Sequence, residues 1–153
     1  MKFLAAVSPL LLGAVSVAAA PVSKPSILNV AKFTAHTQPN GNGATFSFDL
    51  HVPDTGRGTS CAYSDDTSVS ALPAVTMRPC ADPAFEWQFR QDPGRPGAEG
   101  RYRLVVTYDY GSPDHARAAG FNEWDVVDFP LETVGSASET YFRGNPDFAI
   151  NLS

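Results

Sequence analysis

Apolar and polar side chains alternate along several stretches of the chain. The clearest stretch is residues 46–52, whose apolar members are Phe46, Phe48, Leu50 and Val52. The same spacing recurs at Phe85, Trp87 and Phe89, and again at Tyr102, Leu104, Val106, Tyr108 and Tyr110. Successive side chains of a β-strand point to opposite faces, so a period of two is typical of strands with one buried face. The pattern therefore predicts a β protein.

Turn-forming residues separate the alternating stretches. Asn40-Gly41-Asn42-Gly43 lies between two of them, and asparagine and glycine tolerate the positive φ of tight hairpin turns. Further strands are predicted at residues 124–129 and 148–152, whereas the best helical candidate, residues 114–119, spans only about one and a half turns. The chain is thus predicted to be all-β, a small antiparallel barrel or sandwich of about seven to eight strands.

The first twenty residues follow a different pattern. Lys2 precedes a largely apolar stretch over residues 3–12, and small residues lead up to Pro21. A positive charge, a short apolar segment and small residues at a cleavage point are typical of a secretory signal peptide. We expect residues 1–20 to be the signal peptide, cut after Ala19 or Ala20, and residues 21–153 to form a single secreted, extracellular β domain.

Composition narrows the classes of partner. The chain has 11 Lys and Arg against 16 Asp and Glu, a formal net charge of −5. An acidic domain is unsuited to binding nucleic acid, because the phosphates repel it. No stretch after Pro21 is apolar over the length of a membrane span, roughly 20 residues. We therefore expect a soluble monomer that binds neither nucleic acid nor membranes.

The two cysteines of the chain are Cys61 and Cys80. Exported proteins oxidise such a pair because the extracellular space holds no reducing buffer, so we predict a disulfide between them. Closing a loop of about 20 residues stabilises a fold by roughly 3 kcal/mol in the chain-entropy model. A redox role is less favoured, because thioredoxin-type sites need a Cys-x-x-Cys pair at the start of a helix.

The best candidates for catalysis are the acids in Glu123-Trp124-Asp125-Val126-Val127-Asp128. The segment resembles the Glu-x-Asp-x-x-Glu strand motif of β-jelly-roll glycoside hydrolases, which cleave glycosidic bonds with a pair of carboxyls. In a strand, Glu123 and Asp125 would share one face and Asp128 would point to the other. The alternative is a solvated strand face with Trp124 and Val126 or Val127 packed inward. We favour this alternative because the motif is incomplete and those hydrolases are much longer.

Other catalytic and metal chemistry lacks the residues that it needs. The histidines are His36, His51 and His115, without the spacing of metal ligands. Pairing across the Asn-Gly turn places His36 opposite about Phe46 and His51 opposite about Ala31, far apart. Asp114-His115 is interpreted as a solvated turn, and no Gly-x-Ser-x-Gly motif is present. We predict no catalytic residue, no metal and no cofactor.

Three features suggest contact with a partner or a modification. Arg90, Arg95, Arg101 and Arg103 surround a Gly/Pro-rich loop, and loops on rigid β scaffolds often hold binding residues. An exposed tyrosine row, Tyr102, Tyr108 and Tyr110, would suit stacking on sugar rings, although the apolar residues between them favour core packing. Asn151-Leu152-Ser153 is a formal N-glycosylation acceptor.

Several short segments carry a resemblance to a known family. They are residues 30–35, 46–50, 72–80, 85–89, 128–130 and 145–148, in order VAKFTA, FSFDL, LPAVTMRPC, FEWQF, DFP and NPDF. In these segments the chain resembles the Alternaria major-allergen-like family, small secreted fungal β-barrel proteins that include allergens and plant-interacting effectors. The allergen branch has additional cysteines, one of which links two chains, and this chain lacks them.

The resemblance implies a non-enzymatic, effector-like or allergen-like protein that acts by binding, with a host plant protein as the expected partner. Two alternatives remain open from the residues. One is a small glycoside hydrolase that uses Glu123 and Asp125. The other is a carbohydrate-binding module that binds a cell-wall glycan through exposed aromatic side chains.

Overall fold

The computed structural model describes residues 23–38, 42–67, 71–92, 100–111 and 116–153. The strands in this part of the chain are β1 (Ile27–Thr37), β2 (Ala44–Val52), β3 (Arg57–Asp65), β4 (Val75–Pro79), β5 (Phe85–Gln91), β6 (Tyr102–Gly111), β7 (Ala116–Trp124), β8 (Leu131–Val134), β9 (Ala137–Thr140) and β10 (Phe148–Asn151), and η2 (Val126–Asp128) is a short 3-10 helix. The predicted signal peptide, residues 1–20, lies outside the described residues. Among the residues that are described, no helix is long and apolar enough to cross a membrane.

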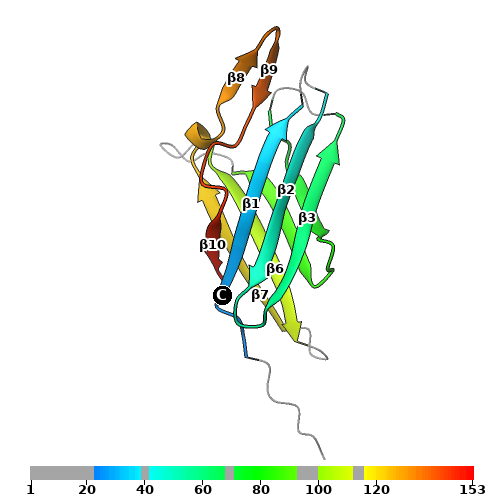
Figure 1. Cartoon of the computed structure of the whole chain (residues 1–153), viewed down its shortest axis with the longest axis vertical. Coiled ribbons are helices and arrows are strands. Elements are labelled where there is room, and N and C mark those ends of the chain that lie inside the picture. Colours follow the sequence, from blue (N-terminus) through cyan, green and yellow to red (C-terminus); the bar gives the residue numbers. More distant parts are fainter. Residues whose placement is uncertain (1–22, 39–41, 68–70, 93–99, 112–115) are drawn as a thin grey trace, which may run out of the picture.

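The strands form two antiparallel four-stranded sheets and a separate hairpin. Sheet A has the order β10-β1-β2-β3, sheet B has the order β4-β5-β6-β7, and β8 pairs with β9. The two sheets face each other, and the β8–β9 hairpin extends beyond them at one end (Figure 1). The prediction of an all-β antiparallel fold with one disulfide is confirmed.

The core lies between the sheets and consists of the alternating apolar residues. Every second residue of β2 is buried, and so is every second residue of β5 from Phe85 to Phe89. In β6 the buried side chains are Tyr102, Leu104, Val106 and Tyr108, and Tyr110 is partly buried against them. The tyrosine row therefore packs into the core, as the pattern favoured, instead of forming a platform for sugars.

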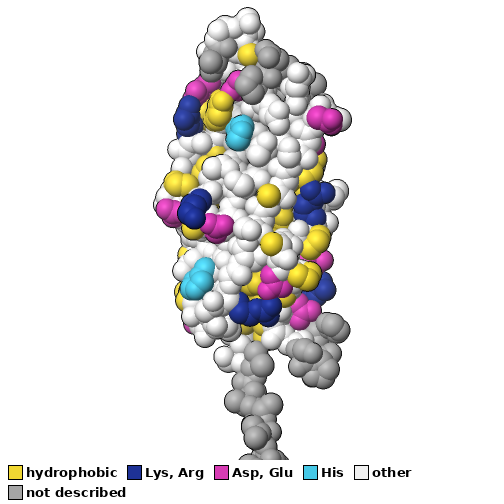
Figure 2. Space-filling model, turned by 45° about the vertical axis from the view of Figure 1, so that its right-hand side comes forward, with side chains coloured by type: hydrophobic (Ala, Val, Ile, Leu, Met, Phe, Trp, Pro, Cys, Tyr) yellow, Lys and Arg dark blue, Asp and Glu magenta, His cyan; other side chains and the backbone are white. Residues whose placement is uncertain are grey.

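Sheet A presents mainly small side chains to solvent. Its outward residues on β2 and β3 include Thr45, Ser47, Ser60, Ala62 and Ser64. On the face shown in Figure 2, charged side chains lie in separate groups that contain both signs. Ala62 of β3 therefore lies between small, uncharged outward side chains of the same strand.

A β-bulge interrupts β1 at Lys32. Two residues of β1, Lys32 and Phe33, lie opposite one residue of β2 at this point. Lys32 has a φ of 55°, which is uncommon for a residue with a side chain. Its backbone N–H donates to the Asp147 carboxylate at 2.9 Å, and its ammonium donates to Asp49 at 2.9 Å. The bulge reverses the alternation, so that Val30 is buried before it and Phe33 after it.

The bulge also changes the register of the first hairpin. β1 and β2 pair antiparallel around the turn, as the Asn-Gly signal predicted. His36 lies opposite Thr45 instead of Phe46, and His51 lies opposite Asn29 instead of Ala31. The register predicted from the sequence therefore differs from the observed register by one residue near the turn and by two residues beyond the bulge. The two histidines still lie far apart, about six residues or roughly 20 Å along β2.

One predicted strand is wrong, and the short helical candidate forms a strand, as the all-β prediction requires. A strand is expected at residues 124–129, but β7 ends at Trp124 and the short helix η2 follows it. This turn of the chain buries Phe129 and leaves Val126 and Val127 exposed. The helical candidate at residues 114–119 is strand β7 from Ala116 onward, since pairing with β6 along its length outweighs local alanine propensity. Residues 112–115 lie outside the described part. The strand expected at 148–152 is confirmed as β10.

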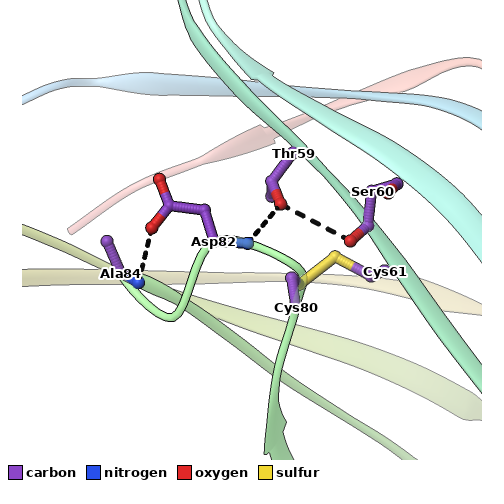
Figure 3. The surroundings of a disulfide bond; sticks show 6 residues. All are labelled: Thr59, Ser60, Cys61, Cys80, Asp82 and Ala84. Atoms are coloured by element: carbon purple, nitrogen blue, oxygen red, sulfur yellow. Dashed lines mark hydrogen bonds between the residues drawn. A yellow bond between two sulfur atoms is a disulfide. The ribbon is translucent and has the colours of Figure 1, made fainter.

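The disulfide lies where β3, at one edge of sheet A, meets the end of β4, at one edge of sheet B. Cys61 of β3 is bonded to Cys80, and their Cα atoms are 4.4 Å apart, as in directly opposed antiparallel residues (Figure 3). Beside the bridge, the Ala81 N–H donates to the Ser60 carbonyl at 2.9 Å. Ser60 faces Ala81 and Cys61 faces Cys80, so the two segments run antiparallel. The bridge therefore joins sheet A to sheet B in strand-like register.

Asp82 fixes the turn that follows the disulfide. Its Oδ1 accepts the Ala84 N–H at 3.0 Å, and its Oδ2 accepts Arg57 at 2.5 Å. Its own N–H donates to Thr59 at 2.8 Å (Figure 3). The Ala84 N–H, and then the Arg57 guanidinium, lower the pKa of the Asp82 carboxyl below its ordinary value of 3.8, against the opposing effect of burial. Folding therefore favours the charged carboxylate.

The Asp82→Asn variant is expected to be less stable than the parent chain by about 1–2 kcal/mol near neutral pH. A carboxyl with a lowered folded pKa contributes stability above its unfolded value of 3.8, and this contribution is lost as the pH falls through the folded value. The difference between the two proteins should therefore shrink below about pH 4. Urea denaturation over a pH series measures it, with Asp54→Asn in an exposed turn as the control. A constant difference down to acid pH would contradict the assignment.

β7 and β10, the other edge strands of sheets B and A, also lie next to each other. Ala119 and Ser153 exchange two backbone hydrogen bonds, of 3.2 and 2.9 Å, as an antiparallel pair does. Next to this pair, a Cβ at Gly120 would stand 2.3 Å from the Asn151 carbonyl oxygen. Because glycine has no side chain, β7 can approach the backbone of β10 closely at Gly120.

The Gly120→Val variant is expected to lower the free energy of unfolding by about 1–3 kcal/mol, because the backbone of β10 must move away. The matched control is Ala119→Val, one residue away, whose side chain faces solvent and whose change should stay within about 0.5 kcal/mol. Urea denaturation measures both. Equal stability of the two variants would show that β10 does not pack against Gly120.

Candidate functional site

Three of the four predicted arginines lie at one end of sheet B. Arg90 of β5 lies opposite Arg103 of β6, a pairing that would be repulsive on its own. Asp92 lies between them, with its Oδ1 3.0 Å from the Arg90 Nε and its Oδ2 2.8 Å from the Arg103 Nη2. Arg101 comes directly before β6. Arg95 lies outside the described residues.

The two candidate catalytic acids join the same network. Glu123 is the β7 residue opposite Arg103, whose Nε donates to Glu123 Oε1 at 2.8 Å and whose Nη2 bonds the same carboxylate. Arg101 donates through its Nε to Asp125 Oδ1 at 3.1 Å, and its Nη1 lies 3.9 Å from Glu123 Oε2. The network therefore balances the guanidinium groups of Arg90, Arg101 and Arg103 with the carboxylates of Asp92, Glu123 and Asp125.

The acids do not form the strand motif of a glycoside hydrolase. β7 ends at Trp124, and Asp128 lies on η2 instead of on the strand. Trp124 is turned inward, stacked on Phe33 with ring centroids 5.0 Å apart. A retaining hydrolase needs two carboxyls about 5–5.5 Å apart around a sugar, one of them protonated. Here Glu123 and Asp125 each face a guanidinium, an arrangement suited to a fixed, charged contact surface.

Exposed apolar side chains flank this network. Phe121 of β7 is 55 % exposed, and the Arg103 guanidinium lies 4.7 Å from its ring centroid. Val126 and Val127, directly after Asp125, are 48 % and 75 % exposed. We call the set Arg101, Arg103, Glu123, Asp125, Val126 and Val127 the arginine surface. It combines charged groups with large apolar groups that the core does not cover.

The sequence pattern missed Phe121, Val126 and Val127 as surface residues. Phe121 is an outward residue of a strand whose inward neighbours, Ala118 and Gly120, are small, so the strand does not show apolar-in alternation. The prediction that Val126 or Val127 packs inward beside Trp124 is wrong, because both valines lie on η2 and are exposed. Residues 121–129 lack strict apolar and polar alternation, and this irregularity is the sequence feature that could have indicated exposed apolar side chains there.

No family model, curated protein or solved structure matches the chain. The family resemblance of the short segments therefore stays a prediction. The geometry of the arginine surface is what bears on function.

A groove runs along the outer side of the β7–β10 seam, next to the arginine surface. Its volume is about 400 Å³, and it is lined by Val105, Ala119, Gly120, Phe121, Asn122, Ala149, Asn151 and Ser153. Asn151, the predicted glycosylation acceptor, thus lies in the same groove as exposed Phe121. Apolar groups and amide side chains meet here, a mixture that is common in sites for small molecules.

The described residues hold no cluster of three or more His, Cys, Asp or Glu side chains that could bind a metal ion. His36 stacks on Tyr141, with ring centroids 5.6 Å apart, and does not approach a second histidine. The two histidines on the face of Figure 2 are well separated. Asp114 and His115 lie outside the described residues.

Proposed function

We propose that this chain is a secreted, non-enzymatic, effector-like or allergen-like protein that binds an extracellular host protein through the arginine surface. The observation that carries the proposal is the pairing of both candidate catalytic acids with Arg101 and Arg103, beside exposed Val126 and Val127. The leader-like first twenty residues and the disulfide support secretion. The family resemblance supports the same role.

The chemistry of the surface fits a protein partner. Protein interfaces combine an apolar centre with a polar rim, and arginine and aromatic residues are enriched in them. Val126 and Val127 supply exposed apolar area, and Arg101 and Arg103 supply guanidinium groups that ion pairs hold in place. Because the ion pairs fix these side chains before binding, less side-chain entropy is lost on association.

The proposal is tested by binding to host extracellular extract. The Val127→Asp variant should bind the captured host protein about tenfold or more weakly, because it places a carboxylate in the apolar part of the arginine surface. The matched control is Ala62→Asp on the outer face of sheet A, which adds the same charge and should bind like the parent chain. Equal binding by all three proteins would overturn the assignment of the surface.

A second measurement addresses hydrolysis directly. The purified parent chain and the Glu123→Gln/Asp125→Asn variant are incubated with a panel of cell-wall glycans, and reducing ends are quantified. We expect no release by either protein. Release by the parent chain that is lost in the variant would overturn the binding proposal in favour of a glycoside hydrolase.

A further inference from the structure

The acceptor sequence Asn151-Leu152-Ser153 takes a definite place in the fold. Asn151 is the last residue of β10 and is exposed, whereas Leu152 is buried. Ser153 is held by its two backbone bonds to Ala119, and its hydroxyl lies 3.3 Å from the Ala119 carbonyl. Strand alternation therefore points the acceptor amide outward while its neighbour anchors the segment in the core.

The surface in front of Asn151 is already shaped for a ligand. The groove of about 400 Å³ has Asn151, Ala149 and Ser153 along one side and Phe121 on the other. Its volume falls within the range of small-ligand sites. A covalently attached sugar at Asn151 would enter this groove first, because the acceptor side chain is one of the residues that line it.

Phe121 gives this groove the chemistry that a sugar ring prefers. It is the exposed aromatic residue of the groove, at 55 % exposure. The face of an aromatic ring is negatively polarised, so the positively polarised C–H groups on one side of a pyranose pack well against it. Asn122 and Ser153 add polar groups for the hydroxyl and acetamido groups of the sugar.

We propose that Asn151 carries an N-linked glycan whose first N-acetylglucosamine lies in this groove against Phe121 and covers the seam between β7 and β10. The anomeric carbon of the glycan forms a bond to the Asn151 amide nitrogen, which loses one proton, while the bond from that carbon to the lipid pyrophosphate of the donor breaks. This inference rests on the secretion that the proposed function includes. It concerns the β7–β10 seam, so the sugar adds contacts that hold sheet A to sheet B.

The experiment uses the full chain expressed in a eukaryotic host that glycosylates exported proteins. Mass spectrometry of the secreted protein should find hexosamine on the peptide with Asn151, and should find none in Asn151→Gln. Ser153→Thr, which keeps an acceptor sequence, should retain the glycan. Enzymatic removal of the glycan should then lower the Tm of the parent chain by about 2–4 °C.

Phe121→Ala provides the decisive comparison. This variant should carry the glycan to the same extent as the parent chain, yet its Tm should not change when the glycan is removed. A secreted chain without glycan would overturn the inference and leave the binding function standing. A glycan whose removal shifts the Tm equally in both proteins would overturn the role of Phe121. Retention of the chain inside the cell, with its leader uncut, would overturn both the secretion and this inference.

Discussion

Replacing Phe33 with alanine is expected to lower the free energy of unfolding by about 3–5 kcal/mol. Phe33 is 1 % exposed and stands at the centre of the aromatic core. Its ring centroid lies 4.9 Å from Phe142, 5.0 Å from Trp124, 5.8 Å from Phe48, 5.9 Å from Phe148 and 6.5 Å from Phe89. These rings come from both sheets and from the segment that leads into β10. Truncation therefore opens a cavity where three parts of the fold meet.

The matched control is Phe121→Ala, which removes the same atoms from an exposed position on β7. It loses the contact with Arg103 and little buried area, so its cost should be about 1 kcal/mol or less. Urea denaturation followed by tryptophan fluorescence gives both values. If the two variants proved equally stable, Phe33 would not be the centre of the core.

The strands that could be predicted are those with a strict difference between their two faces. β2, β5 and β6 have mainly large apolar side chains inward and, apart from Val105 of β6, polar ones outward, because one face of each packs against the opposite sheet. Alternation alone was therefore enough to find them. The same reasoning identified the tyrosine row of β6 as core.

β1 and β7 could not be assigned in detail, for different physical reasons. The bulge at Lys32 depends on a bond from its N–H to Asp147, which is 115 residues away in sequence. In β7 the inward positions Ala118 and Gly120 are small because β10 approaches closely, and Phe121 points outward. Both features are set by contacts between distant segments, which a local pattern does not contain.

The candidate site was predicted in part. The arginines were found from their place around a Gly/Pro-rich loop. Their partners were not, since Arg103 meets Glu123 and Asp92 only after β5, β6 and β7 take their register. Charge pairing across strands depends on that register, so the ion-pair network became visible only with the fold.

Removal of the disulfide is the second large effect. The Cys61→Ala/Cys80→Ala variant is expected to lose about 3 kcal/mol of stability, because its unfolded chain regains the freedom of an uncrosslinked loop. The bridge spans 19 residues in sequence and joins β3 to the end of β4. Unfolding of the parent chain in urea with and without reductant should give the same difference. The matched control is Ser60→Ala/Ser64→Ala, two exposed positions on β3, with a change within about 0.5 kcal/mol.

Amide hydrogen exchange should show which strands lose protection when the disulfide is removed. β4 is an edge strand of sheet B, and the contacts at its junction with sheet A include the bridge, the Ala81–Ser60 bond and the stacking of Arg78 on Tyr63. Without the bridge, amides of β4 should exchange faster by local opening, while those of β1 and β2, inside sheet A, should follow the global change alone. If the double variant had the same free energy of unfolding as the oxidised parent chain, and the same exchange rates in β4, the junction of β3 with β4 would not depend on the disulfide.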